Sequence, residues 1–351
     1  MKRFFKNTLF FLLLCLAGSL LALQLLPDYY GNPLYSDKLE EARELAEAGE
    51  VNTLFYGSSR FYRHIDPRVT DSLLAGEGMS SYNLGATSLL NPQSYVLYEE
   101  FLRGERPEVD YVFLEMSGFR QIKPGNIPTP MNYHYLDPWS LAYIARYMKE
   151  SPRPLDVGGR ILLEYLASYA YKILYAVPDL VEALTGERAI SEAVTRGSRG
   201  YYSLDAEYRA VESDSDPVAL RRRQFLDDST VVDLYASASR RAYGEEGERA
   251  RINRVHLQRL RSLLELSRSR GVELYFVISP RMARYDRILA VRDSLPEERV
   301  IDLGSIVRYP GFYSLEHTFD ANHLNEKGAW HFSRVLAEEI REKLSGEAGA
   351  R

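Results

Sequence analysis

The chain has 351 residues, 45% of them apolar, and carries a formal net charge of -5 at pH 7. A chain of this size can bury one large core, either as one domain or as a domain with an insertion. The acidic balance argues against a nucleic-acid-binding protein, which normally carries a basic surface. A single cysteine excludes a disulfide framework and a cysteine-based zinc site, so the composition indicates neither a metal site nor a cofactor.

The N-terminus carries the clearest targeting signal. Lys2, Arg3 and Lys6 precede residues 8–26, an uncharged segment in which only three residues are polar. As a helix this segment would span roughly 28 Å, close to the thickness of a bilayer core, and the basic flank keeps its N-terminal end cytoplasmic. The alternative is a cleaved signal peptide, whose apolar core would be shorter and would end in a small-residue cleavage site. We expect residues 1–27 to be a retained single-pass signal anchor, with the rest of the protein extracytoplasmic, in the periplasm or at the cell surface.

Hydrophobic patterns along the rest of the chain alternate between strands and helices. A linker and an amphipathic helix occupy 28–50, after which short apolar runs predict buried strands and longer runs with helical spacing separate them. This alternation predicts an α/β domain over 51–345, with a parallel sheet covered by helices on both faces, and a frayed tail at 346–351. The five predicted strands are 51–56, 81–85, 108–116, 272–278 and 299–303, and the last helix is 326–344.

The alternation stops at 119–250, which we interpret as a helical insertion. Prolines open this segment, and helical spacing follows at 139–148 and 160–184. Its many tyrosines could line a sugar-binding cleft, because their rings offer an apolar face with a polar tip, but the preferred interpretation is a tyrosine-rich helical core. The three arginines at 221–223 are interpreted as a solvated helix face rather than a ligand clamp.

Two short motifs supply residue types suited to acyl transfer. Gly57, Ser58 and Ser59 follow the first predicted strand, and ligand chemistry in open α/β sheets gathers at the carboxyl ends of strands. Far downstream, Asp320 and His323 lie three residues apart just before the last helix. A serine becomes a nucleophile when an imidazole removes its proton and a carboxylate fixes the imidazole tautomer. Ser59 and its nearest competitor, Ser58, are the two candidates for the nucleophile.

Together these motifs resemble the SGNH (GDSL-like) hydrolase superfamily, and more closely its membrane-anchored cell-envelope branch, which begins with Gly-Ser-Ser. The resemblance covers 51–118 and 272–345 and leaves the middle of the chain outside it. It implies a flavodoxin-like, three-layer SGNH fold with a five-stranded parallel sheet. It also assigns Ser59 as the nucleophile, His323 as the base and Asp320 as the orienting acid.

Acyl transfer also needs hydrogen-bond donors for the developing oxyanion. The backbone amides of Ser59 and Gly85 are candidates, and Gly85 suits the role because a residue without Cβ lets the backbone approach a ligand closely. The alternative for Gly85 is an ordinary turn glycine at a strand end. Asn83 is a weaker candidate donor, since a turn residue is the preferred interpretation.

The third block departs from the family pattern. The resemblance leads us to expect Gly-x-Asn-Asp, whose Asn side chain completes the oxyanion hole, but the chain has Glu115, Met116, Ser117 and Gly118. Two alternatives remain open: Ser117 replaces the missing donor, or Glu115 pairs with Arg60 across neighbouring strand ends and shapes the pocket. Proteins of the Gly-Ser-Ser branch that acylate alginate or teichoic acid carry such changes, which favours acyl transfer over simple hydrolysis.

The other histidines are interpreted as structural or surface residues. His317 is the only serious alternative base, because it lies near Asp320, but it lacks the Leu-Asn sequence that follows His323. The remaining four are His64, His134, His256 and His331.

We therefore expect a serine-dependent O-acyl transferase or esterase, with acetyl favoured, acting on a cell-envelope or exported polysaccharide or another O-acylated substrate. The N-terminal helix would contact the membrane, and a membrane-bound O-acyltransferase is an optional partner. The first alternative is a catalytically inactive SGNH-like scaffold that binds polysaccharide or an acyl-transporting membrane partner. The second is a plain lipase or esterase. The missing Asn of the third block favours the scaffold, and the set of Ser59, His323 and Asp320 opposes it.

Overall fold

The structure is a computed structural model that describes residues 1–104, 108–185, 197–244, 247, 249–282 and 284–348. The chain divides into two compact units. The helical unit comprises Met1–Ser36 and Gln121–Ile190, and the sheet unit comprises Asp37–Arg120 and Ser191–Arg351. The insertion expected at 119–250 is therefore shared between the two units.

Five parallel strands form one sheet in the order β2-β1-β3-β4-β5. This confirms the five-stranded parallel sheet expected from the alternating pattern. Because all the strands run the same way, their carboxyl ends meet at one edge, and the order of the strands reverses where β1 lies beside β3. The strands are β1 (Thr53–Tyr56), β2 (Ser81–Asn83), β3 (Tyr111–Glu115), β4 (Glu273–Ile278) and β5 (Val300–Asp302).

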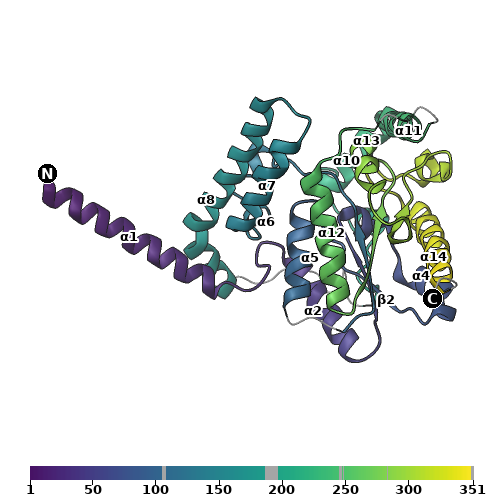
Figure 1. The fold of residues 1–351 in the computed structure, drawn as a ribbon, viewed down its shortest axis with the longest axis horizontal. Coiled ribbons are helices and arrows are strands. Elements are labelled where there is room, and N and C mark those ends of the chain that lie inside the picture. Colours follow the sequence, from purple (N-terminus) through teal and green to yellow (C-terminus); the bar gives the residue numbers. More distant parts are fainter. Residues whose placement is uncertain (105–107, 186–196, 245–246, 248, 283, 349–351) are drawn as a thin grey trace. The chain divides into compact units, whose positions relative to one another are not determined.

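Helices cover both faces of the sheet (Figure 1). On one face α5 (Gln93–Arg103) packs against α12 (Arg254–Ser269), which also contacts β4. On the other face α14 (Glu326–Ala348) packs against α3 (Ser59–His64) and α4 (Pro67–Leu74). The chain thus forms an α/β structure in which helices predominate.

Alternating strand residues supply the core on each face. Tyr56 of β1 contacts Tyr98 of α5, with ring centroids 5.4 Å apart. On the opposite face, Phe55, Phe113 and Tyr275 pair across three neighbouring strands, with centroids 5.4 and 5.3 Å apart. All five rings are at most 1% exposed, so the sheet has a buried core on both sides.

Further helices complete the sheet unit. α14 runs to Ala348, so part of the expected tail is helical, and 349–351 lie outside the described residues. The other helices with residues in this unit are α2 (Pro33–Glu47), α9 (Leu204–Arg209), α10 (Pro217–Asp227), α11 (Thr230–Tyr243) and α13 (Tyr285–Arg292).

The helical unit is built around one long helix. α8 (Leu155–Thr185) packs against α1 (Lys2–Leu25), α6 (Pro130–Tyr133) and α7 (Pro138–Glu150). α7 and α8 confirm both helices expected in the first half of the insertion. Buried tyrosines fill the space between these helices, as a tyrosine-rich core would require, and they include Tyr133, Tyr143, Tyr147 and Tyr165.

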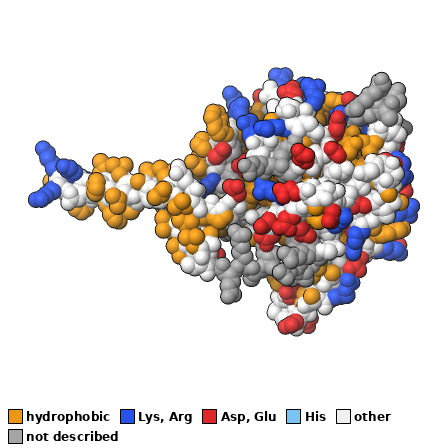
Figure 2. Space-filling model, turned by 90° about the horizontal axis from the view of Figure 1, so that it is seen from below, with side chains coloured by type: hydrophobic (Ala, Val, Ile, Leu, Met, Phe, Trp, Pro, Cys, Tyr) orange, Lys and Arg blue, Asp and Glu red, His pale blue; other side chains and the backbone are white. Residues whose placement is uncertain are grey.

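Among the described residues, α1 is the one helix that is long and apolar enough to cross a membrane. Ala22 is its one buried residue. Figure 2 shows apolar side chains along this helix and Lys and Arg side chains at its N-terminal end. A signal sequence has the same length and composition, so the helix fits either a signal anchor or a signal sequence.

The aromatic ladder predicts a large cost for Phe113→Ala. We expect the free energy of unfolding to fall by about 3–5 kcal/mol, because the substitution opens a cavity between two ring neighbours in a close-packed core. Urea denaturation followed by near-ultraviolet circular dichroism would measure the change. Leu226→Ala is the control, since Leu226 is 64% exposed and its loss should change the free energy by no more than about 0.5 kcal/mol. Equal effects of the two substitutions would contradict the assigned core.

Candidate active site

A tight turn at the carboxyl end of β1 carries Ser59. Gly57 has no room for a side chain, since a Cβ there would lie 2.8 Å from Cβ of Glu115. Ser58 is the N-cap of α3, and its hydroxyl accepts a hydrogen bond from the Arg60 amide at 3.2 Å. Ser59 is therefore held at the edge of the sheet as the first residue of α3, where its side chain is partly exposed.

The end of β3 fixes the same turn from the neighbouring strand. Glu115 Oε2 accepts the Ser58 amide at 2.7 Å, and Glu115 Oε1 lies 3.6 Å from Arg60 Nη1. The carboxylate is buried, which strengthens both contacts because the local dielectric is low. The two strand ends that the sequence analysis considered linking through Glu115 and Arg60 thus lie together, where the strand order reverses.

The loop before α14 carries Asp320 and His323. Its ends meet in a β-bridge between Thr318 and Leu324, and the Phe319 amide donates to the His323 carbonyl at 3.0 Å. Asp320 Oδ1 accepts the His323 amide at 2.9 Å and lies 2.8 Å from His323 Nδ1. The loop is thus closed on itself, and the imidazole has one fixed orientation.

The structure brings Ser59 together with His323, with 2.9 Å between Ser59 Oγ and His323 Nε2. An ionised carboxylate can only accept, so His323 Nδ1 carries the ring proton and donates it to Asp320. This leaves the lone pair on Nε2 for the Ser59 hydroxyl. Because Asp320 and His323 are buried and Ser59 is partly exposed, the serine is the end of this chain that a substrate can reach.

Burial alone would raise the pKa of Asp320, but its contacts outweigh burial. The hydrogen bond from His323, the Asn322 amide and the Arg221 guanidinium, 3.8 Å away, together lower the pKa of Asp320 below its ordinary value. The carboxylate is therefore ionised at neutral pH, as an orienting role for the imidazole requires.

Arg281, which the sequence analysis did not assign, holds this loop from inside. It is fully buried, and its Nε donates to the Phe312 carbonyl at 2.7 Å. Its other nitrogens donate to the Thr318 hydroxyl and the His323 carbonyl. Burial lowers the pKa of Arg281 to about 10, so the side chain still carries its charge at neutral pH.

Arg222 of α10 holds the same loop from outside. Its Nη1 donates to the carbonyls of Thr318 and Phe319 at 3.0 and 2.5 Å, and its guanidinium lies 5.2 Å from the Phe319 ring. The interpretation of the arginine run as a solvated helix face is therefore wrong for Arg222. Arg221 is 45% exposed and lies beside Asp320. Because the three arginines are consecutive and identical in type, the sequence alone does not show that Arg222 binds the loop and that Arg221 lies beside Asp320.

His64 supports the loop from α3. Its Nε2 accepts the Leu324 amide at 3.0 Å, and its ring lies 6.0 Å from the His323 ring between centroids. Burial, followed by the positive charges of nearby arginines, lowers the pKa of His64 well below its ordinary value. His64 is therefore a neutral structural acceptor, in line with the role expected for it.

Gly85 and Asn83 make contacts that hold the turn after β2 against α3. A Cβ on Gly85 would lie 2.6 Å from the Tyr62 nitrogen, which explains why glycine stands there. The Gly85 amide donates to Asn83 Oδ1 at 3.0 Å, and the Gly85 carbonyl accepts from Lys38 Nζ at 2.5 Å. Asn83 Nδ2 donates to two carbonyls of the 61–65 segment, both at 2.7 Å. An oxyanion contact from Gly85 would require its amide to leave Asn83.

Ser117 is buried just beyond β3. Its hydroxyl oxygen accepts the Asn91 amide at 2.9 Å, and its own amide donates to the Tyr95 hydroxyl at 3.3 Å. These contacts tie the end of β3 to α5 and to the loop before it. The structure thus places Ser117 in a structural network, whereas Ser59 faces His323.

His317, the alternative base, faces other partners. Its Nδ1 lies 2.9 Å from the Gly311 carbonyl, and its ring centroid lies 5.4 Å from that of His331. Across the described part of the chain, no group of three or more His, Cys, Asp or Glu side chains is placed to hold a metal ion.

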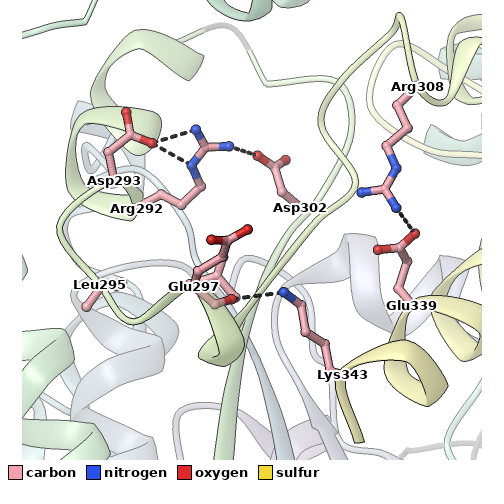
Figure 3. Close-up of a pocket in the computed structure, with 9 residues that line it drawn as sticks. Arg292, Asp293, Leu295, Glu297, Asp302, Arg308, Glu339 and Lys343 are labelled. Carbon is pink, nitrogen blue, oxygen red and sulfur yellow. Dashed lines mark hydrogen bonds and ion pairs between the residues drawn. The ribbon is translucent and has the colours of Figure 1, made fainter. Parts of the chain in front are cut away.

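A pocket of about 440 Å³ lies along β5 (Figure 3). Its charged side chains are largely paired with one another: Arg292 contacts Asp293 and Asp302, and Arg308 contacts Glu339. The pocket contains none of the residues that the sequence analysis selected. Its lining consists of Arg292, Asp293, Leu295, Glu297, Val300, Asp302, Arg308, Glu339 and Lys343.

Comparisons with protein-family models, with curated proteins and with solved structures found no match to this chain. The function of the site is therefore argued from its geometry and from the resemblance of its motifs.

The buried neutral state of His64 predicts a loss of stability on mild acidification. An unfolded histidine takes up a proton near pH 6.5, whereas the lowered pKa keeps His64 neutral in the folded state. Below about pH 6.5 the unfolded state binds more protons, so this group lowers the free energy of unfolding by up to about 1.4 kcal/mol per pH unit. His64→Gln keeps an acceptor for the Leu324 amide and should flatten this fall in urea denaturation between about pH 6.5 and 5.

Three further histidines set the size of the expected change. Burial lowers the pKa of His134 and of His256 to about 4 and also lowers the pKa of His331, so these three groups continue to contribute below pH 6.5. The slope in His64→Gln should therefore be reduced and not abolished. An unchanged slope would contradict the neutral assignment of His64.

Proposed function

We propose that the sheet unit is an SGNH-like domain that acts as a serine-dependent O-acyl transferase or esterase, with acetyl as the favoured acyl group. One observation carries this proposal: the hydrogen-bonded chain from Ser59 through His323 to Asp320, with 2.9 and 2.8 Å between heavy atoms. The strand order, with helices on both faces, supports the flavodoxin-like, three-layer SGNH fold. The position of Ser59 beside the reversal of strand order supports a ligand site there.

The geometry fits a two-step acyl transfer. Ser59 Oγ attacks the carbonyl carbon of an ester while its proton passes to His323 Nε2. The tetrahedral intermediate then expels the alcohol, which takes the proton from His323, and an acyl-Ser59 remains. A polysaccharide hydroxyl or a water molecule attacks this acyl group by the reverse sequence, which yields transfer or hydrolysis. Asp320 keeps the imidazole oriented and stabilises its charged form.

Stabilisation of the oxyanion is the weakest part of this fit. As the first residue of α3, Ser59 has an amide that the helix leaves without a carbonyl partner, and this amide is the best donor candidate. The amide of Gly85 is held by Asn83, and the buried carboxylate of Glu115 stands where the family places a donor block. These observations favour the second candidate function, an inactive scaffold that binds polysaccharide or an acyl-transporting membrane partner.

The anchor and the partners belong to the same proposal. α1 supports a retained signal anchor that leaves the sheet unit outside the cytoplasm, at the cell envelope. A cell-envelope or exported polysaccharide is then the acceptor or substrate. A membrane-bound O-acyltransferase could supply the acyl group, since a domain held at the membrane lies close to such a donor.

Substitution of the catalytic residues separates the enzyme from the scaffold. Ser59→Ala should abolish covalent labelling by a fluorophosphonate probe, and His323→Ala should reduce the labelling rate by roughly 10⁴-fold or more. The double variant should be no worse than either single one, because the residues act as one unit. Asp320→Asn should be milder than the other two, since it impairs only orientation and charge stabilisation.

Ser58→Ala is the matched control for this experiment. It removes the helix cap at a cost of about 1 kcal/mol but leaves the nucleophile, so labelling should persist. The acetyl content of the producing cell's polysaccharide is the second readout. Lost acetylation without ester hydrolysis would favour a transferase, whereas normal acetylation in Ser59→Ala would leave only the scaffold.

The anchor makes a separate prediction. If α1 is retained, the mature protein begins at or near Met1 and stays with membranes through a high-salt wash, because salt weakens surface electrostatic binding but not apolar insertion. N-terminal sequencing of the membrane-bound protein would test this. A mature N-terminus beyond Ala22 would show a cleaved signal sequence instead.

A further inference from the structure

α8 exposes an apolar face that the described part of the chain leaves uncovered. Six large residues project from it with exposed fractions between 43% and 76%, and at about 100° per residue they fall within an arc of about 80°. Ala170 is exposed in the same arc, and no charged residue falls there between 163 and 184. This α8 apolar face consists of Leu163, Leu166, Leu174, Val177, Val181 and Leu184.

Three of the six charged side chains of α8 are turned toward the interior of the helical unit, whereas Asp156, Arg160 and Glu182 are exposed. Asp179 is 7% exposed, and its Oδ2 accepts the Tyr133 hydroxyl at 2.9 Å. Lys172 Nζ donates to two backbone carbonyls of the 134–136 segment at 2.6 and 2.8 Å. Glu164 is 8% exposed. A surface helix of a water-soluble domain has the reverse arrangement, with its apolar stripe inside and its charges outside.

The position of α1 indicates which environment covers this face. α1 packs against α8 within the helical unit, and the contact involves the carboxyl-terminal part of α1, where Ala22 is buried. If α1 spans a bilayer, this part lies at the extracytoplasmic boundary, so α8 lies beside that boundary too. Apolar side chains continue from α1 onto the adjoining surface (Figure 2). Trp139, 82% exposed in the same unit, is a residue type that gathers at membrane interfaces.

We propose that the α8 apolar face lies in the boundary between headgroups and acyl chains of the extracytoplasmic leaflet. The uncharged stripe spans about 32 Å, as in helices that lie flat in a membrane surface. This inference rests on the proposed anchor, because α8 lies next to a bilayer only if α1 spans one. A protein partner would be expected to offer a polar rim with specific pairs, whereas the stripe is uniformly apolar over its length.

Fluorescence quenching in vesicles tests the proposal on the full chain. The protein carries Cys15→Ala and Val181→Cys, is labelled with an environment-sensitive fluorophore, and is reconstituted in phosphatidylcholine and phosphatidylglycerol vesicles. We expect blue-shifted emission that is quenched by lipids with a doxyl group near the headgroup. Leu174→Cys should give the same result about two turns away on the same face.

Two matched positions should show neither effect. Glu182→Cys lies next to Val181 in the sequence but about 100° around the helix. Leu226→Cys reports an equally exposed apolar site on the sheet unit. Circular dichroism of each labelled variant verifies that the helices are intact.

The native Cys15 label in α1 separates this inference from the anchor on which it rests. Quenching of Cys15 by a deep doxyl group, without quenching at Val181, would overturn the inference and leave the anchor in place. No quenching at either position would overturn both. A blue shift at Val181 that lipid doxyl groups do not quench, and that grows with the protein-to-lipid ratio, would assign the face to a second copy of the chain and overturn the bilayer assignment.

Discussion

Arg281 belongs to the loop after β4, and its buried side chain contacts the loop that carries Asp320 and His323. One guanidinium donates to the carbonyls of Phe312 and His323 and to the hydroxyl of Thr318, so it links three groups of the interior. Its backbone φ of 61° lies in the left-handed region, which a residue with a long side chain adopts only where surrounding contacts determine it. Arg281 thus helps to hold His323 beside Ser59, together with Arg222 and His64, which contact the same loop.

Asp320 and His64 both have a lowered pKa, but the result is a charged carboxylate in one case and a neutral ring in the other. Positive groups beside Asp320 help lower the pKa of the carboxyl, so the acid remains charged although it is buried. Burial, followed by nearby positive groups, lowers the pKa of His64, so its ring remains neutral. Asp320 therefore remains a charged orienter, and His64 remains an uncharged acceptor. On the other side of Ser59, the carboxylate of Glu115 faces Arg60.

The sequence was sufficient to predict elements whose signal is local. Five apolar runs gave the five strands of the parallel sheet, and the spacing in 139–148 and 160–184 gave two helices of the helical unit. The chain also brings Ser59 and His323 together, 264 positions apart, at the edge where the first strand ends. Arg281 and Arg222 could not be found this way, because their partners are backbone carbonyls of a distant loop and carry no residue-type signal. The role of Gly85 could not be predicted either. Its amide donates to the side chain of Asn83, a contact that depends on the conformation of the turn.

α8 shows why a helical pattern does not determine which face is buried. The alternation of apolar and polar positions is the same whether a helix rests on a protein core or on a membrane, and the sequence interpretation assumed a core. Polar contacts determine the orientation: Asp179 accepts from Tyr133 and Lys172 donates to two carbonyls, so the side of α8 that carries these two residues must face inward. With that side facing inward, the leucines and valines on the opposite side of the helix face outward. The buried hydrogen bonds of α8, and not its hydrophobicity, therefore define the surface that the helical unit presents beside α1.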